Sequence, residues 1–440
     1  MSASVKQYLE LYDSARQLIG GRDAERAALA SAADDGLDDA FAPTDYGLNL
    51  QRLAVPVDVS RSFGCDIPAI SGAPAALVND IFSAPARMEE RLPKGVRFMS
   101  LRKAAEECPQ LIPANLRCGY DDAETRLNDL LWTDGALLHV AAGVVCEKPL
   151  QLVNIFSSPV DLMAVRRLVI VLERGAQARL LVCDHTQDAE RRYLSAELIS
   201  ANLADGAFLG LDFIEESSAL TVRRSTLNAS LASDAQFQCT ASTLSCGDSR
   251  VRIQVDINGR GAHASVNGMV IADSGQRAAY ATRILHHAEN TSSDQLFKYV
   301  ADGRSRCSFD GRIVVDQQAR FTEAYQTNKN MLASEGATMH AEPTLEIYCD
   351  EVKCSHGAAT GQLDGNALFY MRQRGIPEEQ ARRMLMEAFV GDVIDTVHIA
   401  GLRDRLHHLV ERRFSGLGST CADCSLNNTP NPSADGCTKL

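Results

Sequence analysis

Residues 151–352 are the part of the chain that most limits its fold, because short strand-like segments recur there at a loose period. Apolar and polar side chains alternate within these segments, so each strand buries one face. Several segments begin with a small or turn-forming residue followed by alanine, at separations of 31, 28 and 27 residues. These starts are Gly175-Ala176, Gly206-Ala207, Asp234-Ala235 and Gly261-Ala262, with similar starts at Ala319 and at Gly336-Ala337.

A repeat of this length predicts a parallel β-solenoid, since each coil has a similar corner and covers the edge of its neighbour. A sandwich or jelly roll would place turns about 8–12 residues apart without the longer repeat. We therefore expect a mainly β protein whose core, residues 131–355, is a parallel β-helix.

Different patterns flank the solenoid and predict three further regions. Residues 1–130 carry helix-like segments with irregular connections, so we expect them to be mostly helical. Residues 356–416 are expected to form a C-terminal helical region, because Pro377 is a good helix start and an apolar stripe follows it. Residues 417–440 are rich in small and polar residues, which predicts a flexible tail that contains cysteines. The stripe comprises Ala381, Met384, Leu385, Ala388 and Phe389.

Composition excludes several classes of partner. The 440 residues are 45% hydrophobic, enough for a sizeable core. A formal charge of −13 argues against nucleic acid and membrane surfaces as partners, because both require a surplus of Lys and Arg. The N-terminus lacks the features of a secretory signal and no apolar run is long enough to span a bilayer, so we expect a cytoplasmic protein. Most of the 13 cysteines sit singly in apolar strands, which is typical of reduced core thiols.

Motifs for self-sufficient catalysis are missing from the sequence. It contains no G-x-x-x-x-G-K-[ST] phosphate loop, no strand-linked G-x-G-x-x-G, no H-E-x-x-H and no G-x-S-x-G. We therefore expect a non-catalytic protein that binds no nucleotide itself. Any nucleotide hydrolysis would come from a partner.

Cys354 and His356 form the candidate metal site. They lie two residues apart on an alternating strand, so their side chains should face the same way and could meet one soft or borderline metal ion. Cys349 would face the opposite way if the strand were unbroken. Two ligands are too few for a stable structural site, so this half-site would need completion across an interface. The alternative is an incidental buried thiol beside a hydrogen-bonded histidine.

Other histidines and cysteines have structural interpretations. His286 and His287 are adjacent and would face opposite sides of a strand, so we interpret them as structural or turn residues. His407 and His408 lie near the end of the last helix, where they would complement the helix dipole. The tail residues Cys421, Cys424 and Cys437 have the local spacing of a metal clamp without a fourth ligand, and exposed thiols with no defined site are an equal alternative.

The stretch from about His286 to Phe389 resembles the SufB/SufD family of iron–sulfur cluster assembly scaffolds. The resemblance is carried by FKYVADGRSRCSFDGRIVVDQQARFTEAYQTNKNMLAS and PTLEIYCDEVKCSHGAATGQLDGNALFYMRQRGI. The segment KCSHGAATGQLD is similar to the SufD branch, because Gly357 follows His356 where the SufB branch carries a His-Glu pair. The tail lies outside the family pattern.

This resemblance implies a right-handed parallel β-helix flanked by helical regions. It also implies a SufB-like scaffold that pairs with the C-terminal end of the solenoid, and a SufC-like ABC ATPase held by the C-terminal helices. His356 would help form a transient, nascent iron–sulfur cluster with a cysteine of the partner, and Cys354 is the second candidate ligand. The residues expected at the ATPase interface are Phe369, Arg374, Gly375, Met384 and Phe389.

Two alternatives stay open at this point. A carbohydrate-active solenoid enzyme would need clustered carboxylates, whereas Asp256, Asp273 and Asp316 are scattered. A homodimer of this chain could also act as a self-contained cluster carrier that uses its tail cysteines.

Overall fold

The computed structural model describes residues 73–85, 87–113 and 123–416, and most of them belong to two long β-sheets. The first sheet has ten strands, in the order β19 (Lys353–Gln362), β17 (Glu323–Leu332), β15 (Ser292–Ala301), β13 (His263–Ala272), β11 (Gln236–Ser245), β9 (Phe208–Glu216), β7 (Gln177–Thr186), β5 (Leu150–Phe156), β1 (Ala73–Val78) and β2 (Ile81–Ser83). The second has nine strands, in the order β18 (Thr338–Ile347), β16 (Arg306–Val315), β14 (Arg277–His286), β12 (Asp248–Ile257), β10 (Thr221–Leu231), β8 (Tyr193–Leu203), β6 (Leu162–Leu172), β4 (Asp134–Val140) and β3 (Val96–Ser100).

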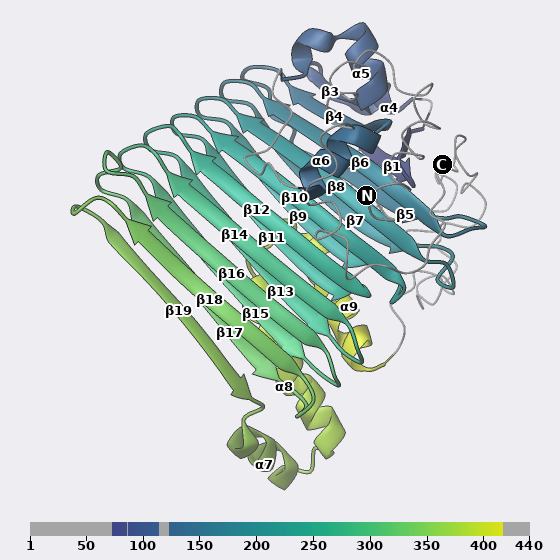
Figure 1. Ribbon diagram of the computed structural model, residues 1–440, viewed down its shortest axis with the longest axis vertical. Helices are drawn as coiled ribbons and strands as arrows, with labels where there is room; N and C mark the ends of the chain where they lie inside the picture. Colours follow the sequence, from purple (N-terminus) through teal and green to yellow (C-terminus); the bar gives the residue numbers. More distant parts are fainter. Residues whose placement is uncertain (1–72, 86, 114–122, 417–440) are drawn as a thin grey trace.

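The two sheets form a parallel β-solenoid, as the repeat predicted. From β4 onward, consecutive strands alternate between the sheets, so each coil of the chain adds one strand to each (Figure 1). Neighbouring coils pair in parallel and in register, as in β15 against β17 and β16 against β18. Only β2 and β3, at the N-terminal end of the described stack, pair antiparallel with their neighbours.

The structure confirms the four predicted corner positions at which strands of the ten-stranded sheet begin. Each has a left-handed backbone conformation, which glycine, asparagine and aspartate tolerate. Gly175, Gly206, Asp234 and Gly261 all have positive φ, between 57° and 74°, and each precedes a buried alanine. In the next two coils this corner is occupied by Asn290 and Phe321 instead.

The starts at Ala319 and Gly336-Ala337 are not further copies of this corner position. Ala319 lies two residues before Phe321 in its turn, and Gly336 precedes β18 at the opposite corner, where the chain returns to the second sheet. The sequence pattern cannot separate the two corners of a coil, because both combine a turn-forming residue with a small one.

The core is a continuous apolar column between the sheets. Upstream coils contribute mainly Leu, Val, Ile and Ala from both inner faces. In the later coils aromatic rings fill the space: Phe297 lies 4.8 Å from Phe309 and 5.6 Å from Tyr280, measured between ring centroids. Stacking identical positions from coil to coil lets each added coil bury the apolar face of the one before it.

Strands extend beyond both expected limits of the solenoid. β1 pairs with β5 and β3 pairs with β4, so residues before 131 already join the sheets, and β19 runs to Gln362 rather than ending near 355. The segment Gly357–Gln362 has little to bury, which removes the alternation that marks the other strands. The division into four regions otherwise stays a prediction, and residues 1–72 and 417–440 lie outside the described residues.

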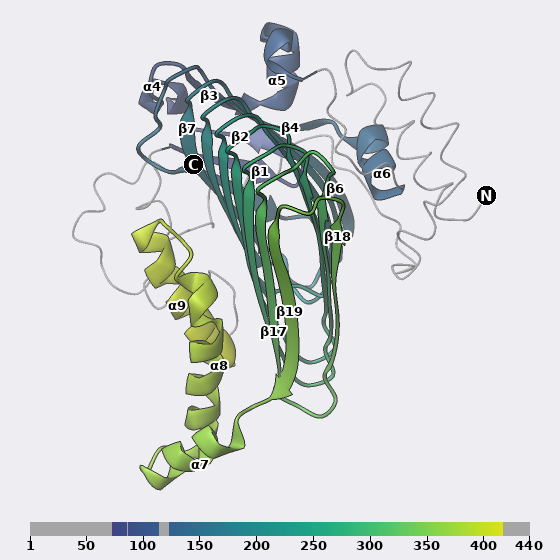
Figure 2. The same ribbon diagram turned by 90° about the vertical axis from the view of Figure 1, so that its left-hand side faces the viewer.

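Short helices surround the first coils, and three longer ones follow the last. The early helices are α4 (Met88–Arg91), α5 (Leu101–Glu107), η4 (Pro109–Leu111) and α6 (Ala123–Leu131), and α6 packs on β6 and β8. The C-terminal helices are α7 (Gly365–Gln373), α8 (Glu378–Ile394) and α9 (Ala400–Phe414). Helices α8 and α9 lie along the outer face of the ten-stranded sheet, while α7 projects beyond it (Figure 2).

The buried face of α8 differs from the predicted stripe. Ala381 is buried, but the face continues through Met386, Val390 and Val393, while Met384 and Ala388 are exposed. The stripe in the sequence combined residues of two faces, because apolar side chains surround much of this helix. His407 and His408 lie in the middle of α9 rather than in its last turn, where Arg412 and Arg413 stand, so the helix-dipole interpretation is wrong.

No helix within residues 73–85, 87–113 and 123–416 combines the length and apolarity that a membrane crossing requires.

The buried aromatic rings of the later coils should contribute strongly to the free energy of unfolding. Phe309→Ala removes a fully buried ring and should lower the free energy of unfolding by about 3–5 kcal/mol. Phe369→Ala is the matched control, because Phe369 is 64% exposed and its loss should change stability little. Urea unfolding followed by circular dichroism measures both. Equal losses in the two variants would contradict the assignment of the core.

Candidate functional site

The C-terminal end of the solenoid is an open coil. Among the described residues, β18 pairs only with β16 and β19 pairs only with β17, so each is the last described strand of its sheet. Each strand is ten residues long, and β19 is mostly exposed. Figure 1 shows β19 at the end of the stack of strands. Proteins usually cover, shorten or charge such edges, because their unpaired N–H and C=O groups can pair with another chain. A long uncovered edge on both sheets is therefore a candidate surface for a partner.

Cys354 and His356 lie on this terminal strand and face the interior of the solenoid. In the parallel register of β19 and β17, Cys354 stands beside Ala324 and His356 beside Gln326, and both β17 residues are buried. The prediction that the thiol and the imidazole share a face is therefore confirmed. Cys354 is half-buried against the core, whereas His356 is exposed.

Cys349 is separated from this pair by a break in the strand. It lies in the corner between β18 and β19, so the alternation used to place it on the opposite face does not apply. Its side chain packs against the same core as Cys354.

Burial makes the Cys354 thiol a less ready metal ligand than an ordinary exposed thiol. Burial raises the pKa of Cys354 above its ordinary value, and a hydrogen bond with the backbone of Ala324 opposes this only in part. The thiol is therefore protonated near neutral pH, while the metal-binding form is the thiolate. His356 presents its ring at the exposed edge.

The half-site is incomplete within this chain as far as the structure describes it. Among those residues, no three His, Cys, Asp or Glu side chains are placed to share a metal ion. A metal at His356 would need ligands from elsewhere, because two protein ligands do not complete a four-coordinate site.

The inner face of β17 is polar, which sequence reasoning missed. Gln326, Asn328 and Asn330 point inward and are buried. The neighbouring strand β15 carries Phe297 and Tyr299 beside the two asparagines, and Gln295 beside Gln326. The run Gln326–Asn330 contained the signal, since five consecutive polar residues make both faces of this strand polar. The apolar column therefore ends in a polar layer just before the open coil.

A second missed feature is an ionic cluster inside the solenoid near its other end. Arg166 pairs with Asp184 across the interior at 2.9 Å, and Arg223 contacts Glu215 at 2.9 Å and Glu197 at 3.2 Å. Burial opposes ionisation of Asp184, but Arg166 and Arg223 outweigh it and lower the pKa. Burial and the charge of Asp184 raise the pKa of Glu215 to about 8, so this carboxyl is mostly protonated at neutral pH.

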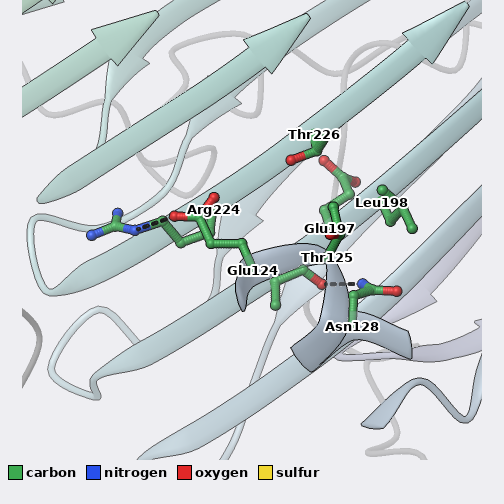
Figure 3. Close-up of a pocket in the computed structure, with 8 residues that line it drawn as sticks. Glu124, Thr125, Asn128, Glu197, Leu198, Arg224 and Thr226 are labelled. Atoms are coloured by element: carbon green, nitrogen blue, oxygen red, sulfur yellow. Dashed lines mark hydrogen bonds and ion pairs between the residues drawn. The ribbon is translucent and has the colours of Figure 1, made fainter. Parts of the chain in front are cut away.

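A third polar group fixes α6 on the outside of the nine-stranded sheet. Glu124 contacts Arg224, Arg250 and Arg252, and Asn128 donates hydrogen bonds to two carbonyl groups of the sheet. Figure 3 shows Glu124 and Asn128 of α6 facing Arg224 and Glu197 of the sheet. The cavity between them has room for about one water molecule at roughly 10 Å³. These contacts hold a helix in place and leave no room for a ligand.

His286 and His287 are structural, as predicted. His286 is fully buried and bonds Thr291 at 2.8 Å and Ser293 at 2.9 Å, and burial lowers its pKa to about 3. His287 bonds Asp316 at 2.7 Å.

The residues expected at the ATPase interface fall into two groups. Phe369 and Met384 are 64% and 42% exposed, and Arg374 stacks on the neighbouring exposed ring of Tyr370. Gly375 ends α7 with a φ of 85°. Phe389, in contrast, packs against the chain's own sheet, where Lys298 contacts its ring and its carbonyl oxygen. Cys421, Cys424 and Cys437 lie outside the described residues.

The proton on Glu215 should make stability depend on pH. The folded state keeps this proton up to about pH 8, whereas the unfolded state releases it near pH 4.3. The free energy of unfolding therefore loses a contribution as pH rises from about 5 to 9. Glu215→Gln removes that loss, so its thermal midpoint should fall less over this range than that of the unmodified chain. Glu335→Gln, at an exposed corner, should leave the original profile. Parallel profiles for all three proteins would contradict the raised pKa.

Comparison with known proteins gives two family matches. The family described as "SUF system FeS cluster assembly, SufBD core domain" matches residues 155–389, and "SufBD protein N-terminal region" matches residues 33–152. The first alone covers more than half of the chain.

Individual relatives agree with these matches. An iron–sulfur cluster assembly SufBD family protein of Synechocystis is 25% identical over 370 residues, 82% of each chain. The iron–sulfur cluster assembly protein SufD of Bacillus subtilis is 26% identical over 333 residues, 74% of this chain and 75% of that protein. SufD of Escherichia coli is 31% identical over 167 residues, 38% of this chain and 40% of that protein. The two matched regions, the parallel solenoid and these relatives together show that the chain belongs to the SufBD family of iron–sulfur cluster assembly proteins.

Proposed function

We propose that this chain is a SufD-like scaffold subunit, which pairs with a SufB-like subunit and a SufC-like ATPase to build and transfer nascent iron–sulfur clusters. The observation that carries the proposal is the position of His356, exposed on an uncovered terminal strand and aligned with the solenoid interior. Gly357, which follows His356, and the similarity to two proteins named SufD support the SufD branch.

The open coil supports pairing with a second solenoid. β18 and β19 present parallel, unpaired edges of equal length, and another chain with the same kind of open end could continue both sheets. Such pairing would satisfy the free backbone groups and bring side chains of the partner close to His356. The exposed aromatic residues Phe321 and Tyr348 lie at the corner next to this edge and would extend the contact.

An incomplete ligand set suits a cargo that must leave. A closed cage of four protein ligands would hold an iron–sulfur cluster as a permanent cofactor. One imidazole from this chain, with further ligands from a second subunit, would hold it only while the two faces meet. Cys354 is the second candidate ligand, and its raised pKa means that it would need metal or a nearby positive charge to lose its proton.

The C-terminal helices support the ATPase contact. Phe369, Tyr370 and Met384 expose apolar surface on α7 and α8, although neighbouring helical residues are buried against the sheet. The sequence carries no phosphate loop, so nucleotide hydrolysis belongs to the partner and this chain is non-catalytic. Phe389 is not part of the proposed contact, because the chain's own sheet already engages it.

The rival functions have less support. Membership of the SufBD family leaves no observation that favours a carbohydrate-active enzyme. A homodimeric carrier is an outcome that the experiment below distinguishes, because two copies of this chain could also pair through their open coils.

Removing the imidazole should abolish cluster formation without preventing assembly of the complex. His356→Ala, co-expressed with its SufB-like and SufC-like partners, should co-purify with both and accumulate no cluster on reconstitution with ferrous iron and sulfide. Visible absorption and iron and sulfide content measure the cluster. His340→Ala is the matched control, since His340 is an exposed histidine on the other terminal strand and faces outward.

A normal cluster yield in His356→Ala would reject the assigned site. Cluster formation by this chain alone, lost when the tail cysteines are replaced, would favour the homodimeric carrier instead.

An acidic substitution on α7 should weaken ATPase binding. Phe369→Asp places a charge in the proposed apolar contact and should raise the dissociation constant about tenfold or more, the size expected for an aromatic anchor. Leu220→Asp provides the control, because Leu220 is also exposed but lies in a corner of the solenoid. Isothermal titration with the purified ATPase measures both. Unchanged binding in Phe369→Asp would remove α7 from the interface.

A further inference from the structure

Three side chains form an in-register column that ends at the open coil. Gln295 on β15 stands beside Gln326 on β17, and Gln326 stands beside His356 on β19. All three face the interior, and neighbouring strands of a sheet lie about 4.8 Å apart. In-register polar side chains in such stacks are close enough to bond one another, as in glutamine ladders. No hydrogen bond joins the three side chains in this structure, so the column places the imidazole beside a buried amide without bonding the two.

The two glutamines are buried without hydrogen-bond partners. Gln295 is 3% exposed and Gln326 is 1% exposed, and neither the oxygen nor the nitrogen of either side-chain amide has a partner. A buried amide left unbonded costs roughly 1–3 kcal/mol. The neighbouring asparagines differ, because Asn330 donates to Asn328 and to Thr360, and Asn328 donates to a backbone carbonyl. The glutamines thus retain donors and acceptors that folding has not used.

Space for the Gln326 amide is provided by a glycine on the opposite sheet. A Cβ atom at Gly311 on β16 would lie 2.2 Å from Nε2 of Gln326 and 2.7 Å from its Cδ. Gly311 does not have positive φ, so its backbone conformation does not require glycine. Because Gly311 has no side chain, the Gln326 amide has room in the interior. Gln326 itself lies on the strand next to that of His356.

We infer that Gln326 is a positioning residue for His356, whose amide bonds one imidazole nitrogen and leaves the other for iron. The inference rests on the proposed function of His356. A ligating histidine usually bonds a second partner through its other ring nitrogen, and this bond fixes the tautomer and the direction of the ring. A neutral amide can donate or accept, so it can bond the ring in either tautomer. Gln295, one strand further in, can bond Gln326 but not the imidazole.

The test separates the role in cluster assembly from a role in folding. Gln326→Leu removes the unbonded amide and keeps the volume, so the free energy of unfolding should stay unchanged or rise. In the complete complex the same variant should lower the initial rate of cluster formation from ferrous iron and sulfide about tenfold or more, the usual effect of losing such a partner. Gln295→Leu is the matched control, because it has the same chemistry and burial in the same column and should leave the rate normal.

Two further variants keep the inference falsifiable. Gly311→Ala should displace the amide without deleting it and lower the rate, whereas Gln326→Glu should retain much of the rate, because a carboxylate can also accept from the ring N–H. Cobalt(II) added to the complex gives a second readout: its visible spectrum should change in Gln326→Leu and not in Gln295→Leu.

Each result decides between distinct conclusions. A normal rate and cobalt spectrum in Gln326→Leu, with an inactive His356→Ala, would overturn the positioning role and keep the proposed function. Equal losses of rate and stability in Gln326→Leu and Gln295→Leu would show a packing role and also overturn it. An active His356→Ala would reject the proposed function itself, together with the inference.

Discussion

The structure depends on edge coverage: in a parallel solenoid, each coil is stabilised because the next coil pairs with its exposed backbone and buries its apolar face. At the N-terminal end of the described stack, the antiparallel strands β2 and β3 are the last members of the two sheets. At the other end, β18 and β19 are uncovered along ten residues each. The fold thus contains one interface that its own described residues do not complete. The proposed site at His356 lies at that end, so under the proposed function assembly with a partner would be a condition for building it.

The buried polar residues inside the solenoid also differ between its N-terminal and C-terminal ends. Near the N-terminal end, Arg166 and Arg223 meet three carboxyl groups, and the raised pKa of Glu215 removes the excess negative charge at neutral pH. That cluster is internally paired, which buried charges require. The polar residues near the open coil differ, because the amides of Gln295 on β15 and Gln326 on β17 have no partners. The ionic cluster of Arg166 and Arg223 is satisfied by ion pairs within the chain. The two glutamines instead keep hydrogen-bond donors and acceptors that are unused, next to the open coil.

The sequence predicted the architecture well because the solenoid is a local repeat. The corner residues Gly175, Gly206, Asp234 and Gly261 carry their conformational requirement in their own chemistry, and the shared face of Cys354 and His356 follows from strand geometry alone. The predictions that were wrong came from sequence patterns that two different structures can produce. Gly336 marks the other corner, Met384 lies on the exposed side of an apolar helix, and β19 lacks alternation because no described strand covers it. The ionic cluster joins strands of different coils, so no local pattern reveals it.

The exposure of β19 and the burial of Gln326 have the same cause: β19 is the terminal described strand, and it covers the strand that carries Gln326. Under the proposed function the site releases its cargo and must be reachable, which agrees with the position of His356 on the last described strand. A reachable imidazole on an edge strand has little packing to hold its ring, and loss of orientation weakens a metal ligand. The strand beneath is the nearest place for a group that restrains the ring, because it is the first fully paired one and its side chains are fixed by burial. An open, transient site therefore favours a polar residue at the inward position of β17 that stands beside His356, and Gln326 occupies that position.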